Sequence, residues 1–149
     1  MTAVTGKNDD GQCNVPVAPG SGAVLKWADV AAGGRHTCAI GTDRHLECWG
    51  SNDEGQCNTE CTSFWIRVST GDRHTCAIAA DRSIKCWGAN EMGQCDVPMT
   101  LDDSGTSIPI TDFSDVCVPC FFHPSKILVN VSLTSFQFMR RISHVCCTE

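Results

Sequence analysis

The residues best suited to chemistry lie in a short string that occurs twice in this chain. Residues 35–40 and 73–78 both read RHTCAI, so a histidine precedes a cysteine by two positions in each copy. Side chains two positions apart on a strand share a face. Histidine nitrogen and cysteine sulfur are zinc ligands, and a cysteine beside a histidine base can act as a nucleophile. The string is therefore compatible with a metal site, a catalytic pair or a repeated structural element.

A repeat of 38 residues contains this string. One such interval separates Trp27 from Trp65, and it also separates three cysteine pairs: Cys38 and Cys76, Cys48 and Cys86, and Cys57 and Cys95. Complete units span about 27–57 and 65–95, and residues 6–16 (GKNDDGQCNVP) repeat the end of a unit. The first two unit ends lie 44 residues apart, because a stretch rich in Gly, Ala, Pro and Ser lengthens that loop. Identical copies of the string favour a structural repeat over a catalytic pair.

Each unit contains two short alternating runs that predict an antiparallel hairpin, HTCAI and HLECW in the first unit, HTCAI and SIKCW in the second. The apolar residues share one face when Cys38 lies opposite Cys48 and Ile40 lies opposite Leu46. The second unit matches when Cys76 lies opposite Cys86. This register predicts a three-residue hairpin loop, and it places the two cysteines of each hairpin directly across from each other.

The repeat length and its short strands are typical of β-propeller blades. The unit resembles the repeat of the regulator of chromosome condensation family in its Gly-x-Arg-His-Thr strings (33–37 and 71–75), its Trp-Gly pairs (49–50 and 87–88) and its Asn-x-x-Gly-Gln turns. The resemblance covers about residues 6–98 and implies a seven-bladed β-propeller. Two complete units and a fragment are too few to close such a ring. We therefore expect an all-β fold of incomplete propeller blades of about 38–44 residues.

The resemblance also implies structural roles for the repeated side chains. The histidines are expected to make structural hydrogen bonds, the tryptophans to pack the blades and the glutamines to complete the turns that end each unit. These residues are His36, His74, Trp49, Trp87, Gln56 and Gln94. The hairpins lack the family's usual Asp-Gly and read Asp43-Arg44 and Asp81-Arg82 instead.

The chain has 12 cysteines among 149 residues, a fraction close to that of disulfide frameworks. The hairpin register makes Cys38–Cys48 and Cys76–Cys86 the candidate disulfides, with buried reduced thiols as the alternative. Zinc binding by the histidine and cysteines of a hairpin is disfavoured, because the usual two tight ligand pairs are absent. The sequence identifies no partner for four other cysteines, namely Cys13, Cys57, Cys61 and Cys95.

The repeat pattern is lost after residue 98, and residues 99–149 are expected to form a linker and an irregular, poorly ordered cysteine-rich tail. An intact third unit would require another His-Thr-Cys strand near residue 112. The tail holds one Cys-x-x-Cys pair and nearby histidines, so zinc binding is an alternative role for it. The candidate ligands are Cys117, Cys120, His123 and Cys146.

Charge and hydropathy exclude several classes of partner. The formal net charge is -6 and no basic run is present, so nucleic-acid binding has little electrostatic support. The longest uncharged C-terminal run, 127–139, is shorter than the roughly 20 residues of a spanning helix, and membrane partners are not expected. The N-terminus shows no signal peptide, although paired cysteines would suit an oxidising compartment, so the localisation is left open.

These features predict a non-enzymatic protein–protein interaction module without a cofactor, forming part of a larger repeat protein. The variable loops 17–26 and 58–64 are expected to contact another protein. Self-assembly that completes a propeller is a further expectation. The alternatives are a regulatory part of a ubiquitin ligase or guanine-nucleotide exchange factor, and a zinc-binding protein that uses the tail.

Overall fold

The structure is a computed structural model, and it describes residues 6–17, 26–59, 63–97, 99–101, 107–109, 113–117 and 128–131. Strands are the only regular elements in these ranges, and no helix there could span a membrane. The strands are β1 (Trp27–Ala32), β2 (His36–Gly41), β3 (Leu46–Gly50), β4 (Trp65–Thr70), β5 (His74–Ala79), β6 (Ile84–Gly88), β7 (Met99–Leu101), β8 (Ser107–Pro109), β9 (Phe113–Cys117) and β10 (Leu128–Val131).

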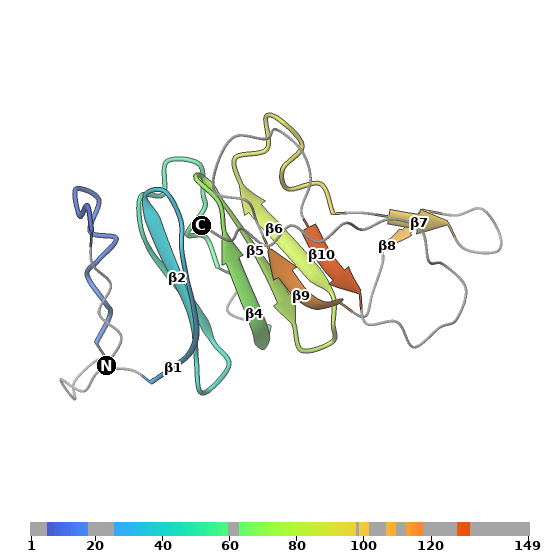
Figure 1. Ribbon diagram of the computed structural model, residues 1–149, viewed down its shortest axis with the longest axis horizontal. Helices are drawn as coiled ribbons and strands as arrows, with labels where there is room; N and C mark the ends of the chain where they lie inside the picture. Colours follow the sequence, from blue (N-terminus) through green and yellow to red (C-terminus); the bar gives the residue numbers. More distant parts are fainter. Residues whose placement is uncertain are drawn as a thin grey trace.

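Each complete repeat unit folds into one three-stranded antiparallel sheet. The first sheet, blade 1, has the order β1-β2-β3, and the second, blade 2, has the order β4-β5-β6. The two blades lie side by side, with β4 packed against β1 and β2 (Figure 1). The prediction of an all-β fold with partial propeller blades is confirmed.

The hairpin register agrees with the register predicted from the alternation of apolar residues. Cys38 lies opposite Cys48 and Ile40 opposite Leu46, and Cys76 lies opposite Cys86 in blade 2. The backbone N–H of Gly41 donates to the carbonyl of His45 at 2.8 Å, which closes a three-residue loop.

The last loop residue of each hairpin adopts a left-handed conformation, with φ of 68° at Arg44 and 69° at Arg82. Three-residue hairpin loops need this conformation at their final position, and it usually favours glycine. The preceding aspartate stabilises the loop, because its carboxylate accepts a hydrogen bond from the backbone N–H two residues on, at 3.1 Å for Asp43 and 2.9 Å for Asp81. The hydroxyl of Ser83 also donates to Asp81, and these bonds hold the pKa of the Asp81 carboxyl below its usual value.

A β-bulge marks the start of the first strand in both blades. Trp27 pairs with Gly41 and Asp29 with Ile40, so Ala28 is skipped in the ladder. In blade 2, Trp65 pairs with Ala79 and Arg67 with Ile78. Such a bulge puts two residues of one strand opposite one of its partner, and it bends the strand locally.

The largest apolar cluster lies between the two blades. It joins three residues of the blade 1 hairpin to four residues of blade 2, and all are nearly inaccessible to solvent: Cys38, Ile40, Leu46, Trp65, Val68, Ala77 and Ala79. A second cluster lies on the opposite side of blade 2 and consists of Cys76, Ile78, Ile84 and Val116. Repeat proteins bury their apolar faces between neighbouring units in this way.

Four short strands follow residue 98, where the sequence indicated a linker and an irregular tail. The short strands β7 and β8 pair with each other, and β9 pairs with β10. Val116 in β9 is 6% exposed and belongs to the second apolar cluster. The interpretation of this region as an irregular tail therefore does not describe 113–117.

Candidate functional site

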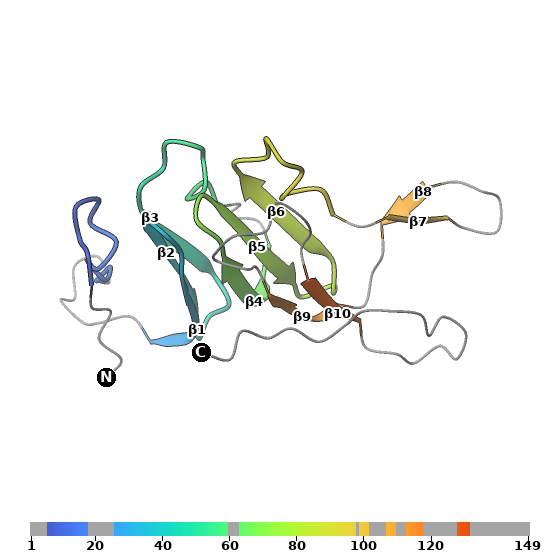
Figure 2. The same ribbon diagram turned by 45° about the horizontal axis from the view of Figure 1, so that its top comes forward.

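The turns that end the units have one structure, repeated three times. These exit turns, at 8–13, 52–57 and 90–95, lie at the same end of the blades (Figures 1 and 2). In each, the asparagine side chain accepts a hydrogen bond from the cysteine backbone N–H, at 2.7–2.8 Å. The glutamine side chain accepts one from the backbone N–H two residues earlier, at 2.8–3.0 Å. The Asn-x-x-Gly-Gln-Cys string is therefore a self-contained loop.

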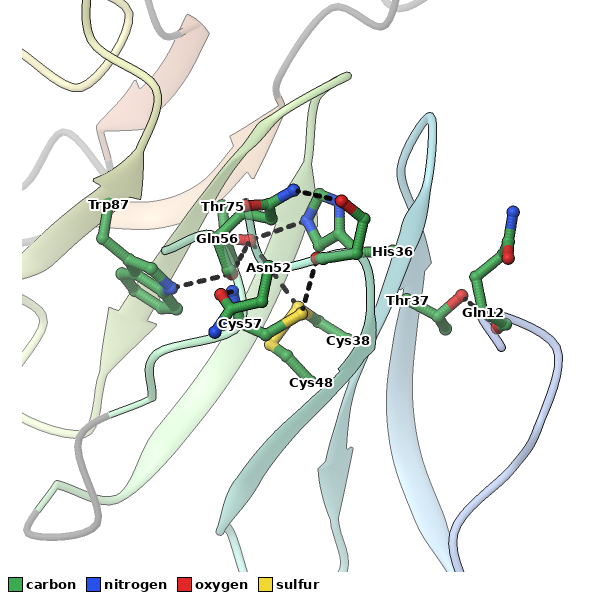
Figure 3. The surroundings of a disulfide bond; sticks show 11 residues. Gln12, His36, Thr37, Cys38, Cys48, Asn52, Gln56, Cys57, Thr75 and Trp87 are labelled. Atoms are coloured by element: carbon green, nitrogen blue, oxygen red, sulfur yellow. Dashed lines mark hydrogen bonds between the residues drawn. A yellow bond between two sulfur atoms is a disulfide. The ribbon is translucent and has the colours of Figure 1, made fainter. Parts of the chain in front are cut away.

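Each of the first two exit turns is attached to the following blade through the backbone carbonyl of its glutamine. The carbonyl of Gln56 accepts hydrogen bonds from the Thr75 hydroxyl at 2.9 Å and from the Trp87 indole at 3.0 Å. The carbonyl of Gln12 is bonded in the same way by Thr37 at 2.8 Å and Trp49 at 3.0 Å. The repeated threonine, tryptophan and glutamine thus connect one unit to the next (Figure 3).

His36 lies at the centre of the junction between the blades. It is completely buried, and its Nε2 lies 2.9 Å from the Thr75 hydroxyl oxygen (Figure 3). The Thr75 hydroxyl donates its proton to Gln56, so we infer that the hydrogen bond with His36 is donated by Nε2–H. Burial, together with the nearby His74, lowers the pKa of His36 to about 4. The imidazole is therefore neutral near pH 7 and serves as a structural donor.

The cysteines of the string do not form a metal or catalytic site with this histidine. Disulfides join Cys38 to Cys48 and Cys76 to Cys86, with a Cα–Cα distance of 4.1 Å in each pair. A disulfide sulfur has no thiolate to attack a substrate or bind zinc. Among the described residues, no group of three or more histidine, cysteine or carboxylate side chains could hold a metal ion.

Three free cysteines in the described part of the chain occupy one equivalent position in the exit turns. They are Cys13, Cys57 and Cys95, and all are partly buried. Each thiol donates to a backbone carbonyl six residues earlier, at 3.2–3.5 Å. Burial raises the pKa of Cys57, and burial together with Asp96 raises that of Cys95 to about 11. The Cys57 and Cys95 thiols are therefore protonated and poorly reactive near neutral pH.

The two blades also touch through their glycines. The N–H of Gly34 donates to the carbonyl of Gly71 at 3.2 Å. A Cβ atom on Gly33 would collide with the same carbonyl oxygen and with the His36 ring. Glycine is required there by the close approach of two chain segments, a contact that no local pattern in the sequence predicts.

A row of charged side chains, ion-paired in two groups, runs along the exit-turn end of the blades. We call this row the rim, and it consists of Asp10, Arg35, Asp53, Glu54, Asp72 and Arg73. Arg35 donates two hydrogen bonds to Asp10, at 2.7 and 2.9 Å, and these raise the pKa of its guanidinium. Arg73 bonds Glu54 at 3.3 Å. Four carboxylates face two guanidinium groups, so the rim carries an acidic surplus.

Several predicted residues fall outside the described part of the chain. Of the candidate zinc ligands, Cys117 is the last residue of β9, while Cys120, His123 and Cys146 lie outside the described residues. Zinc binding by the tail therefore stays a prediction. Much of the two predicted contact loops, and Cys61, likewise lie outside the described ranges.

Blades that share a Trp-x-x-Val strand, a disulfide hairpin and an exit turn bonded to the next blade define a repeat protein of the β-propeller type. The sequence matches the family described as "Regulator of chromosome condensation (RCC1) repeat" at residues 27–56 and 65–94. The chain thus contains two RCC1 repeats, and the predicted family is confirmed. Comparison with curated proteins gives no match.

Solved structures with the same fold include yeast and human proteins. Prp20p from Saccharomyces cerevisiae, described with its binding to Gsp1p and histones, has a TM-score of 0.53 and 17% identity over 76% of this chain and 36% of its own. Yeast RCC1 (Prp20) bound to Kap60 has a TM-score of 0.54 and 16% identity over 77% of this chain and 35% of its own. Human WBSCR16 has a TM-score of 0.50 and 15% identity over 64% of this chain and 31% of its own. This chain therefore spans about a third of the structures it matches.

Proposed function

We propose that the chain is a non-enzymatic protein-interaction module and that it contributes blades to a larger propeller. The observation that carries this proposal is the rim, where charged side chains project from a rigid junction. Asp53 and Asp72 have side chains that are 76% and 69% exposed, although both belong to the ion-pair row. Charged groups fixed on a rigid frame favour selective binding, because little side-chain freedom is lost on association.

The chemistry of the rim favours a partner with a basic surface. The row has more carboxylates than guanidinium groups, and the whole chain carries a formal charge of -6. Complementary charge speeds encounter and disfavours partners of the same sign. The binding of Kap60 by yeast Prp20 supports the general idea that an RCC1-type propeller can present a surface to another protein.

A charge reversal tests the rim as the binding surface. The Asp72→Lys chain should no longer capture the proteins that the wild-type chain captures from an extract of its native source. Capture by the wild-type chain should weaken as the salt concentration is raised. Glu47→Lys is the matched control, because Glu47 is an exposed carboxylate on β3 outside the rim. Equal capture by both variants and the wild type, at every salt concentration, would contradict the proposal.

The two alternatives are separated from this proposal by other measurements. A regulatory part of a ubiquitin ligase or exchange factor requires a catalytic domain elsewhere in the gene product, and the full-length transcript would reveal it. A zinc-binding tail requires stoichiometric zinc in protein purified under reducing conditions.

A further inference from the structure

We propose that β9 and β10 form the first two strands of a third propeller blade and that they cover the docking face of blade 2. The face consists of Cys76, Ile78 and Ile84. Its occupant is a part of this chain, the strand pair Phe113–Cys117 and Leu128–Val131, in which the RHTCAI string does not recur.

The first argument is the pattern of residue types. Blade 1 begins Trp27-Ala-Asp-Val30, and β9 begins Phe113-Ser-Asp-Val116. Blade 2 begins Trp65-Ile-Arg-Val68, so an aromatic residue precedes a valine by three positions in all three strands. This spacing is unusual for a regular strand, where residues three apart face opposite sides, and it requires a bulge.

The second argument is that β9 contains that bulge at the same place. Phe113 pairs with Val131 and Asp115 with Asn130, so Ser114 is skipped. Ala28 is skipped in blade 1 and Ile66 in blade 2, at the equivalent second position. The hairpin of β9 and β10 therefore repeats the register of the first two strands of each blade.

The third argument is where the strand packs. β9 contacts β4 and β5, as β4 contacts β1 and β2, and both views place it beside blade 2 (Figures 1 and 2). Val116 is 6% exposed against the blade 2 hairpin, and Val68 is 7% exposed against the blade 1 hairpin. Val30, the same position in blade 1, is 46% exposed. A valine at this position is thus buried where a blade precedes it in the described structure.

The register explains why the third unit escapes detection in the sequence. Leu128 occupies the position of Cys38 and Cys76, because it lies opposite Cys117 as they lie opposite Ala31 and Ser69. Asn130 stands at the position of Ile40 and Ile78. The hairpin disulfide of the other two blades cannot form at Leu128, since the position lacks sulfur.

Three valine-to-alanine variants of the full chain test the proposal. Val68→Ala and Val116→Ala should each lower the urea midpoint of unfolding by similar amounts, because each removes a buried inter-blade contact. Val30→Ala is the matched control and should shift the midpoint much less. A Val116→Ala midpoint equal to that of the wild type, or of Val30→Ala, would overturn the assignment.

Hydrogen exchange gives an independent readout, and its decisive measurement is made on the wild-type chain. The hydrogen-bonded amides of Phe113–Cys117 should be protected in the wild-type chain as those of Trp65–Thr70 are, and Val116→Ala should speed exchange in β9 and β10. Exchange in wild-type β9 at the rate of an unstructured peptide would refute the third blade. These stability and exchange measurements do not involve the rim. A rim that binds no partner would therefore leave their results unchanged.

Discussion

At the scale of single residues, His36 shows how a group with catalytic potential becomes structural. Its ring is completely buried, its Nε2 is paired with Thr75, and its Nδ1 has no partner in the described residues. A buried imidazole without a carboxylate partner stays neutral, because charging it would cost desolvation free energy. The same burial that removes it from catalysis makes the junction sensitive to acid.

Acidification should weaken the fold through His36. Its pKa is lowered from 6.5 to about 4, so the unfolded chain binds a proton more readily than the folded one, and stability falls as pH drops from 7 towards 4. The loss from His36 should be about 2 kcal/mol between pH 7 and pH 5. Burial lowers the pKa of His74 as well, which adds an effect of the same sign.

Urea unfolding at several pH values measures this effect. His36→Gln keeps a donor for Thr75 but cannot titrate, so its stability should depend less on pH than that of the wild type. Identical pH profiles for the two chains would show that His36 does not govern acid sensitivity.

The hairpin loop offers a substitution that should stabilise the protein. Arg44 has a φ of 68°, which costs a side-chain-bearing residue about 1–2 kcal/mol, and glycine avoids this cost. Glycine loses more backbone entropy on folding, so Arg44→Gly should gain no more than about 1 kcal/mol. Asp43→Gly is the control and should destabilise the loop, because it removes the carboxylate bonded to the His45 N–H. Thermal unfolding of both variants would decide, and a lower midpoint for Arg44→Gly would contradict the argument.

At the scale of the element, each blade is a sheet whose hairpin is closed by a disulfide. The Cys38–Cys48 and Cys76–Cys86 bonds each span a separation of 10 residues. The cross-link chiefly restricts the unfolded chain, and a loop of this size corresponds to about 2–3 kcal/mol in the loop-entropy view. Each disulfide thus holds its hairpin closed independently of the contacts between the blades.

Removal of one hairpin disulfide should therefore destabilise its blade. The Cys38→Ala/Cys48→Ala chain should be less stable than the wild type by about 2–3 kcal/mol in urea unfolding, and reduction of the wild type should act in the same direction. Cys13→Ala is the control, because Cys13 is a free thiol in an exit turn. Mass spectrometry of non-reduced peptides should show Cys38 linked to Cys48, and free thiols at both positions would disprove the pairing.

At the scale of the whole molecule, the blades are held together by contacts that cross the junction. The side chains of Trp65 and Val68 pack on the blade 1 hairpin. The backbone N–H of Trp65 donates a hydrogen bond to the backbone carbonyl of Arg44 at 2.9 Å, and the backbone N–H of Gly34 donates one to the carbonyl of Gly71. Stability of such an array is a sum of unit and interface contributions. A defect at the junction should therefore uncouple the blades while each hairpin stays intact.

Gly33→Ala should produce that defect. The added methyl group would meet the Gly71 carbonyl and the His36 ring, and overpacking of this kind costs about 1–3 kcal/mol. Urea unfolding followed by tryptophan fluorescence should shift to a lower midpoint and become less cooperative. Ala32→Ser is the control, since Ala32 is exposed one residue earlier. An unchanged transition for Gly33→Ala would show that the junction can relax without cost.

The sequence alone determined the repeat and the hairpin register, which puts the two cysteines of each hairpin opposite each other, and it indicated the propeller class. These follow from local rules, because the two-residue period of a strand allows one register that keeps Cys38, Ile40 and Leu46 on one face. Whether those cysteines are bonded was decided by the structure. Tertiary structure decided the burial of His36, since its partner Thr75 lies 39 residues away. It also decided the place of β9, because packing on blade 2 needs the shape and register of a strand rather than the RHTCAI string. Inter-blade contacts depend on which faces meet in space, and a single unit does not encode that information.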